Sequence, residues 1–196
     1  MSSSRDALIA SSIQDSIKVK QALLADTVLL TQINSVIQAF VTALSNGHKI
    51  LLFGNGGSAA DAQHIAAEFV GRFQMERTPL PALALTVNTS ALTGTGNDYA
   101  YENVFSRQIE ALGQTGDVAV GFSTSGKSPN VLKALAAAKA KGLVTVALTG
   151  KFGSMLQEVS RYCLCVPSSE TPRIQESHIL IGHIISQITE MELFAK

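Results

Sequence analysis

The chain has 196 residues, with 15 lysines and arginines against 15 aspartates and glutamates, so its formal net charge at pH 7 is zero. This balance excludes the basic surface with which nucleic-acid binding proteins neutralise phosphates, and we expect no nucleic-acid partner. No unbroken apolar run is long enough to span a bilayer and the first ten residues do not resemble a secretion signal, so we expect a cytoplasmic protein with no membrane partner.

Two amphipathic helices are predicted at the start of the chain. Ile9, Ile13 and Ile17 recur at steps of four within residues 4–25, and a second apolar stripe runs through residues 28–44. Charged residues make up only 15% of the chain, well below the roughly 25% usual for soluble domains. We therefore expect apolar surface of these helices to be covered between subunits.

After residue 48 the pattern changes to short apolar runs separated by helical stretches. Runs that are apolar throughout are typical of parallel strands buried on both faces, so the pattern predicts an α/β fold with a five-stranded parallel sheet flanked by helices. The predicted strands are Ile50–Phe53, Ala82–Leu85, Val118–Phe122, Val144–Leu148 and Tyr162–Val166. The predicted helices of this part are Ser58–Phe73, Tyr101–Leu112, Pro129–Lys141, Ser154–Ser160 and Thr171–Phe194.

The chain is predicted to form a single domain, residues 1–196, because it contains no linker, low-complexity tract or tandem repeat. Within it, residues 1–47 supply the two helices for oligomerisation and residues 48–196 form the α/β sandwich. In such sheets ligands bind beyond the carboxyl ends of the strands, so the loops that follow the strands are the candidate binding segments.

The loop that follows the first strand is suited to an anion. Its glycines let backbone N–H groups approach a ligand at a helix start, and Asn55 and Ser58 add side-chain donors. The G-x-G-x-x-A pattern of dinucleotide binding also matches, but the strand that ends at Leu85 lacks the acidic residue that would hold a ribose. A turn that only packs strand against helix is the third interpretation.

The loop that follows the third strand carries four hydroxyl groups, on Ser123, Thr124, Ser125 and Ser128, which suit a phosphate monoester. The same segment satisfies the G-x-x-x-x-G-K-[ST] pattern of nucleotide triphosphatases. No predicted strand ends in the aspartate that would hold magnesium, and Pro129 fixes the helix start directly after the loop, so this alternative is disfavoured.

Four side chains on two helices are candidates for catalysis or metal binding. His64 and Glu68 are four residues apart and share a helix face, although such a pair is often only a surface contact. Gln175 and His183 lie two turns apart on the last helix, and His178 points elsewhere and is predicted to be structural. Together they form a set of N and O ligands that suits zinc, with glutamine an uncommon member.

The two cysteines, Cys163 and Cys165, form a C-x-C sequence in a predicted strand. Alternation places both on one face of the sheet, in a geometry that disfavours a direct disulfide. A metal pair is one interpretation, and buried, inert thiols are the favoured one.

Four segments together resemble the sedoheptulose-7-phosphate isomerases, or phosphoheptose isomerases, of the SIS (sugar isomerase) domain superfamily. They are GNGGSAADAQHIAAE at 54–68, GNDY at 96–99, STSGKSPN at 123–130 and RIQESHILIGH at 173–183. The resemblance implies an SIS-type sandwich in a cytoplasmic homotetramer. It also implies isomerisation of sedoheptulose 7-phosphate to D-glycero-D-manno-heptose 7-phosphate, the first step towards ADP-heptose and the lipopolysaccharide core.

Carried over by position, the resemblance implies one zinc ion per subunit and an acid-base pair formed by Glu68 and His183. Asn88 and Glu170 stand where relatives commonly have aspartate, which affects details of substrate positioning. The implied zinc ligands are His64, Glu68, Gln175 and His183, and the implied substrate contacts are Asn55, Gly56, Gly57, Ser58, Glu68, Asn97, Asp98, Ser123, Thr124, Ser125, Ser128 and Gln175.

The main alternative is a non-catalytic SIS protein that binds a sugar phosphate or the bacterial replication initiator. The presence of both Glu68 and His183 favours the enzyme, because the initiator-binding relative lacks the acid and the imidazole at these positions. An isomerase that acts on another sugar phosphate would keep the same residues and differ in the depth of its pocket.

Overall fold

A computed structural model describes residues 2–195 and confirms the predicted fold class. Five parallel strands form one sheet in the order β2-β1-β3-β4-β5. From β1 the chain runs outward to β2 at one edge of the sheet; it then returns to β3 and runs outward through β4 to β5 at the other edge. This reversal places a topological switch point between β1 and β3. The strands are β1 (Ile50–Gly54), β2 (Ala82–Ala84), β3 (Val118–Ser123), β4 (Val144–Thr149) and β5 (Tyr162–Cys165).

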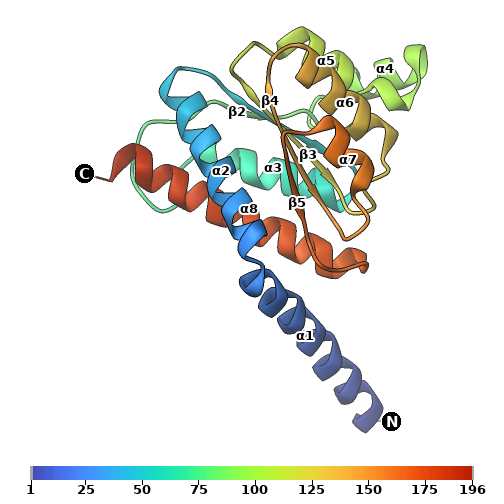
Figure 1. The fold of residues 1–196 in the computed structure, drawn as a ribbon. Coiled ribbons are helices and arrows are strands. Elements are labelled where there is room, and N and C mark those ends of the chain that lie inside the picture. The colour runs from blue at the N-terminus through green and yellow to red at the C-terminus, as the bar shows by residue number, and fades with distance from the viewer. Residues whose placement is uncertain (1, 196) are drawn as a thin grey trace.

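Helices cover both faces of the sheet, as Figure 1 shows. Helices α2, α3 and α8 pack on one face, and α5, α6 and α7 pack on the other. The α-helices are α1 (Ser2–Ala25), α2 (Thr27–Ser45), α3 (Gly57–Val70), α4 (Thr89–Tyr99), α5 (Ser106–Leu112), α6 (Pro129–Ala140), α7 (Ser154–Val159) and α8 (Thr171–Phe194), and a short 3₁₀ helix, η1, spans Tyr101–Asn103.

Successive side chains of the central strands enter two separate cores. Ile50 and Leu52 pack with α2, α3 and α8, whereas Leu51 and Phe53 pack with the helices of the opposite face. All four are fully buried, because side chains alternate across a strand and helices cover both sides. This burial explains why the strand sequence is apolar throughout.

Helices α3 and α8 run side by side in the same direction. Gly57 lies against Gln175 near the start of both helices, and Ile65 lies against Gly182 further along. A Cβ atom at Gly182 would lie 2.6 Å from Ile65 Cδ1, so a larger residue there would push the two helices apart. Glycine at this position therefore permits a close approach of the helices.

The stretch between β2 and β3 differs from the prediction. Helix α4 is absent from the predicted elements, and the helix predicted over 101–112 is divided into η1 and α5. The sequence of α4 contains Gly94, Gly96 and three threonines, which are weak helix formers, and it has no buried residue to reveal a periodic face. Its start is fixed instead by Asn88, whose side chain accepts a hydrogen bond from Ala91 N at 3.0 Å.

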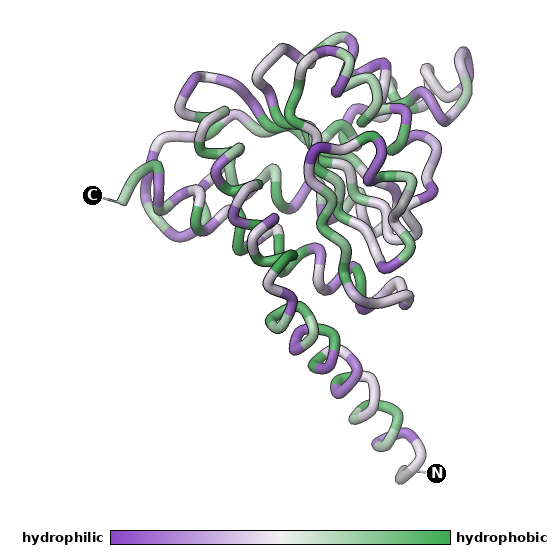
Figure 2. The backbone as a smooth tube through the Cα atoms, in the orientation of Figure 1, coloured by the Kyte–Doolittle hydropathy of each residue, from purple (hydrophilic) through white to green (hydrophobic). Residues whose placement is uncertain are grey.

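Helix α1 extends away from the sandwich (Figure 1), and apolar segments recur along its length (Figure 2). Its predicted apolar stripe is exposed in the single chain: Ile9, Ile13 and Ile17 keep 55%, 58% and 42% of their surface. Polar contacts join its middle to the start of α8, where Ser16 Oγ donates to Glu176 Oε2 at 2.7 Å. The described part of this chain thus leaves about half of the surface of the stripe uncovered.

Among the described helices, α2 is long and apolar enough to cross a membrane by length and composition. This property was not predicted from the sequence, because polar residues interrupt the apolar run. Leu29, Ile33, Val36 and Phe40 are nevertheless buried in the protein core. That packing is typical of a core helix in a soluble fold.

The two cysteines share one face of β5, as predicted, and both are free thiols. Their sulfur atoms lie 3.7 Å apart. Cys163 is buried, but Cys165 is only half-buried, and the hydrogen bond from Cys163 lowers the pKa of Cys165 to about 6. The prediction of two buried, inert thiols therefore fits Cys163 and is wrong in burial for Cys165.

Candidate active site and metal centre

The loops that follow β1 and β3 meet at the switch point of the sheet, because Gly54 pairs with Phe122 in the strand register. Asn55 and Asn130 exchange two side-chain hydrogen bonds of 2.9 Å across the gap between the loops. Tyr101 Oη donates to Asn55 Oδ1 at 3.2 Å. These three residues and Ser128 line a cavity of about 430 Å³.

In the loop that follows β3, residues 123–128, hydroxyl groups form hydrogen bonds within the loop. Ser123 Oγ and Ser128 Oγ are 2.9 Å apart, and Lys127 N donates to Ser125 Oγ at 3.2 Å. Thr124 and Ser125 line a second cavity, of about 210 Å³. The loop thus presents hydroxyl groups to two cavities.

Two lysines that were not among the predicted site residues also line this second cavity. Lys127 and Lys151 form no ion pair with any residue in the range 2–195, and no carboxylate lines the cavity. The first residue of the 24-residue helix α8, Thr171, lies at the same cavity. Two unpaired cations and a helix N-terminus create an electrostatic environment suited to an anion.

Three of the four predicted metal ligands form one cluster between α3 and α8. His64 Nε2 lies 3.0 Å from Glu68 Oε1 and 3.0 Å from His183 Nε2. The three ligand atoms all lie within 4.8 Å of one another. His64 is exposed, and Glu68 and His183 are half-buried, so solvent and a substrate can reach the cluster.

The donor set fits a zinc ion. Two ligands of a tetrahedral zinc, each about 2.0–2.2 Å from the metal, lie about 3.3 Å apart. This is close to the 3.0 Å that separates His64 Nε2 from Glu68 Oε1 and from His183 Nε2. Two imidazoles and a carboxylate also form the usual ligand set of a zinc site that keeps a position open. A small adjustment of the side chains would therefore suffice for metal binding.

Gln175 lies at the other end of the α3-α8 contact. A Cβ atom at Gly57 would overlap Gln175 Nε2 and would lie 2.9 Å from its Cδ. The amide therefore packs directly on a glycine of the loop that follows β1, which we call the first anion loop. Eight residues separate Gln175 from His183, a rise of about 12 Å along the helix. The amide thus lies at the loop end of the α3-α8 contact. Its two predicted roles, substrate contact and zinc ligand, stay predictions.

The structure does not join every predicted residue to this group. Asn97 and Asp98 lie on the exposed end of α4, where Asn97 Nδ2 donates to Asp98 Oδ1 at 2.8 Å. Within residues 2–195, neither forms a hydrogen bond with the loops or the cluster. Ser58 is buried at the start of α3, and Gly56 precedes that helix with a φ of 56°, a conformation that favours glycine.

His178 is buried, in agreement with the prediction that it is structural. It is fully enclosed beside the ring of Phe122, with ring centroids 6.0 Å apart. Burial lowers the pKa of His178 to about 4, so the imidazole is neutral at pH 7. Its place in the core explains why it does not join His64 and His183.

A carboxyl group near the cluster was missed by the sequence analysis. Asp61 lies one turn before His64 on α3, and its Oδ2 atom is buried without a hydrogen-bond partner among the described residues. Burial raises the pKa of Asp61 to about 6, although the nearby His64 opposes the shift. A group that titrates close to neutral pH therefore lies beside the cluster.

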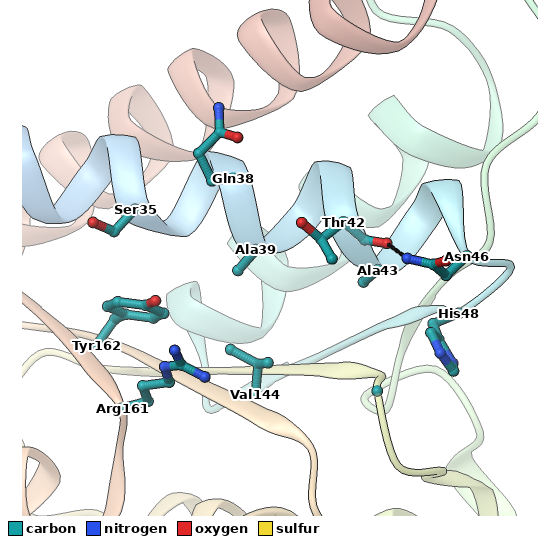
Figure 3. A pocket seen from close by; sticks show the side chains of 11 residues that line it. Ser35, Gln38, Ala39, Thr42, Ala43, Asn46, His48, Val144, Arg161 and Tyr162 are labelled. Atoms are coloured by element: carbon teal, nitrogen blue, oxygen red, sulfur yellow. Dashed lines mark hydrogen bonds between the residues drawn. The ribbon is translucent and has the colours of Figure 1, made fainter.

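A cleft of about 360 Å³ at the opposite end of the sheet contains none of the predicted site residues (Figure 3). Arg161, Tyr162 and His48 line it at the amino ends of the strands, and Gln38 and Thr42 line it from α2. The predicted loops lie at the carboxyl ends, as the general rule for parallel sheets requires. The candidate active site is thus on the other side of the molecule.

The fold and the site together define a protein of the SIS domain family. The SIS domain model matches residues 10–150. The relatives include the phosphoheptose isomerase of Aneurinibacillus thermoaerophilus, 56% identical over 95% of this chain and 94% of its own length. Another is the phosphoheptose isomerase of Burkholderia pseudomallei strain 1710b, 52% identical over 96% of this chain and 95% of its own.

Solved structures agree with this assignment. The phosphoheptose isomerase GmhA from Neisseria gonorrhoeae superposes with a TM-score of 0.87 and 42% identity, over 94% of this chain and 98% of its own. A phosphoheptose isomerase from Francisella tularensis gives a TM-score of 0.90 and 37% identity, over 94% and 97% of the two chains. The chain belongs to the phosphoheptose isomerase family, whose members are aldose-ketose isomerases.

Proposed function

We propose that this protein interconverts sedoheptulose 7-phosphate and D-glycero-D-manno-heptose 7-phosphate, the first step towards ADP-heptose. The observation that carries the proposal is the His64-Glu68-His183 cluster, which lies two turns along α3 from an anion-binding loop. A phosphate held at the loop and a reacting carbon at the cluster are the two requirements of an isomerase for a phosphorylated sugar. Family membership supports the reaction class.

The phosphate end of the substrate is assigned to the two loops at the switch point. Ser123, Thr124, Ser125 and Ser128 offer hydroxyl donors, and the glycines of the first loop let N–H groups approach the anion. Lys127 and Lys151 add positive charge without a competing carboxylate. Binding energy from this remote group orients the reacting end and assists the chemical step.

Glu68 is assigned as the base that moves a proton between carbons. In the direction of aldose formation, its carboxylate removes a proton from C1 of the ketose and later delivers a proton to C2. His183 gives a proton to O2 and accepts one from O1, so the enediol forms and collapses without net gain or loss of protons. The two groups lie within 4.8 Å of each other, close enough to act on adjacent atoms.

One zinc ion per subunit is assigned to His64, Glu68, Gln175 and His183. A bound zinc ion would supply Lewis acidity that stabilises negative charge developing on the substrate oxygens. Independently of the metal, Gln175 positions an amide over the first anion loop. The half-buried Glu68 stays close to His64 at 3.0 Å, which orients the carboxylate towards the cluster.

We assign a cytoplasmic homotetramer to the functional protein. The exposed stripe of Ile9, Ile13 and Ile17 supports assembly, since a stripe of this kind is costly to leave in water. Assembly through α1 also bears on the site, because Arg173 and Glu176, which flank Gln175 on α8, contact α1. We assign residues 1–47 to oligomerisation through the exposed stripe of α1, and residues 48–196 to the catalytic sandwich, on which α2 also packs.

The test is incubation of the purified protein with sedoheptulose 7-phosphate in deuterium oxide. We expect formation of the heptose with deuterium at C2, beside the aldehyde. Glu68→Gln removes the carboxylate base and should abolish both signals with the fold intact. Glu76→Gln makes the same chemical change at a strongly exposed side chain and should leave both unchanged.

Near-normal turnover in Glu68→Gln would contradict the assignment of the base. Binding of the sugar phosphate by the wild type without product or exchange would overturn the proposed reaction and favour a non-catalytic sensor or partner-binding protein. Deuterium uptake without accumulation of heptose would support the enediol step and reject the assigned product.

A further inference from the structure

A buried ion pair ties together the two helices that carry the cluster. Arg77 Nε lies 2.9 Å from Glu190 Oε1, and the two side chains are only 1% and 2% exposed. Glu190 lies two turns beyond His183 on α8, and Arg77 lies in the segment that follows α3. Buried charges persist only when they are paired and fully hydrogen-bonded, so every contact of this pair is informative.

Arg77 caps the end of α3. Its Nη2 atom donates to the carbonyl oxygen of Glu68 at 2.7 Å, and its Nη1 atom donates to those of Phe69 and Gly71 at 2.8 and 3.0 Å. The last carbonyl groups of a helix have no partner within the helix, and a cation there also complements the helix dipole. Arg77 therefore holds the backbone of the residue assigned as the base.

Glu190 organises the segment between α3 and Arg77. Its two carboxylate oxygens accept hydrogen bonds from the backbone N–H groups of Phe73, Gln74 and Met75, at 3.0, 2.8 and 3.0 Å. Burial raises the pKa of Glu190, but these bonds and Arg77 outweigh burial and hold the pKa below its ordinary value. The carboxylate is therefore charged at neutral pH.

This arrangement places an aromatic ring on the cluster. Phe73 is the first residue held by Glu190, and its ring centroid lies 5.6 Å from that of His183, with the ring planes inclined by 33°. The phenyl ring limits the positions that the imidazole can adopt. One carboxylate on α8 thus controls both the end of α3 and the surroundings of His183.

We propose that Arg77 and Glu190 are positioning residues that fix the separation of His64 and Glu68 on α3 from His183 on α8. The proposal rests on the proposed function of the cluster in catalysis and zinc binding. The separation of the His64 and His183 nitrogens is 3.0 Å, so a shift of about 1 Å between the helices is enough to cost about 100-fold in rate. Partners that orient metal ligands typically contribute about 10- to 100-fold in metal affinity.

A second buried carboxylate provides a matched control. Asp117 has a fully buried side chain that pairs with Lys49 Nζ at 2.7 Å. It also accepts hydrogen bonds from the backbone N–H groups of Lys49 and Gln114, at 3.0 and 2.8 Å. Asp117 precedes β3 at the amino end of the sheet, so it reproduces the chemistry of Glu190 far from the cluster.

The experiment compares Glu190→Gln with Asp117→Asn in the full-length protein. We expect both to lower the free energy of unfolding, because each removes a charge that accepts buried hydrogen bonds. Only Glu190→Gln should weaken zinc binding, by about 10- to 100-fold in competition with a chromogenic chelator, and lower kcat by a similar factor. KM for the sugar phosphate should change by less than about threefold, because the phosphate loops are at the other end of α3.

A metal-free readout separates positioning from stability. In protein without zinc, the ring ¹⁵N resonances of His183 should shift in Glu190→Gln and stay unchanged in Asp117→Asn. Glu190→Asp keeps the charge with a shorter reach and should restore part of the zinc affinity. If Glu190→Gln does not fold, Arg77→Lys is measured in the same way, because it keeps the charge and replaces the two guanidinium nitrogens that cap α3 by a single ammonium group.

Equal zinc affinity, kcat and imidazole resonances in Glu190→Gln and Asp117→Asn would overturn the proposal and leave the pair a purely structural role. Failure of the wild type to bind zinc or convert the sugar phosphate is a different result, because it rejects the proposed function itself. A loss of kcat in both variants that scales with their loss of stability also overturns the positioning role.

Discussion

Replacing His178 by leucine should remove a specific part of the pH dependence of stability. The ordinary pKa of the imidazole is 6.5, and burial lowers it to about 4 in the folded protein. The unfolded chain therefore binds a proton as the pH falls below about 6.5, while the folded protein does not until the pH approaches 4. The stability contributed by a neutral His178 is complete above the unfolded pKa and is lost as the pH falls towards 4.

The size of the effect follows from the two pKa values. A difference of one pKa unit corresponds to about 1.4 kcal/mol. The titration of His178 should therefore lower the free energy of unfolding of the wild type by about 2.5 kcal/mol as the pH falls from about 7.5 to about 4.5. Other groups also titrate in this range: Asp61, with its raised pKa, acts in the opposite direction, and Glu190 and Asp117 act in the same direction. All three are present in both proteins and cancel in the comparison.

The assay is urea unfolding, followed by circular dichroism, for the wild type and His178→Leu at several pH values. Protein concentration is held constant, because assembly changes the apparent stability. We expect the difference in unfolding free energy between the two proteins to move by about 2.5 kcal/mol in favour of the variant as the pH falls over this range. Parallel curves would refute the reasoning, since they would show that His178 is not held neutral in the core.

Three further predictions concern the site, the thiols and assembly. Gly57→Ala places a methyl group against Gln175, so kcat should fall at least about 10-fold while the unfolding free energy changes by less than about 1 kcal/mol; unchanged kcat would contradict the close packing. Cys165, with a pKa of about 6, should react with iodoacetamide at pH 7, and Cys165→Ser should abolish labelling; labelling that begins only above about pH 8 would reject the lowered pKa. Joint replacement of Ile9, Ile13 and Ile17 by serine should lower the mass measured by light scattering while the helical signal persists, and an unchanged mass would show that α1 does not mediate assembly.

The sheet was predictable because its strands are buried on both faces. Residues 50–53 are uniformly apolar, and a strand of this kind belongs to a parallel sheet covered by helices. Helix α4 was missed because it buries nothing and contains two glycines, so neither periodicity nor propensity reveals it. The order of the strands depends on contacts between distant segments, which the local pattern does not contain.

The candidate site was predictable to the extent that its residues follow helical spacing. His64 and Glu68 share one turn, and that spacing alone indicated a common face. The partners that organise the site are separated by long stretches of sequence: Arg77 and Glu190 are 113 residues apart, and Asn55 and Asn130 are 75 apart. No local pattern connects such pairs, and their roles emerge only once the helices and loops are packed.

Under the proposed function, the alignment of the anion loop and the cluster along a single helix would set the length of substrate that fits. From Gly57 to His64, α3 rises by about 10.5 Å. The extended chain of a heptose, from its first carbon to the phosphorus on its seventh, spans about 10 Å at about 1.25 Å per bond. With the phosphate held at the loop, a five-carbon sugar phosphate would leave its first carbon about 2.5 Å short of the cluster, so the length of α3 would favour the seven-carbon substrate.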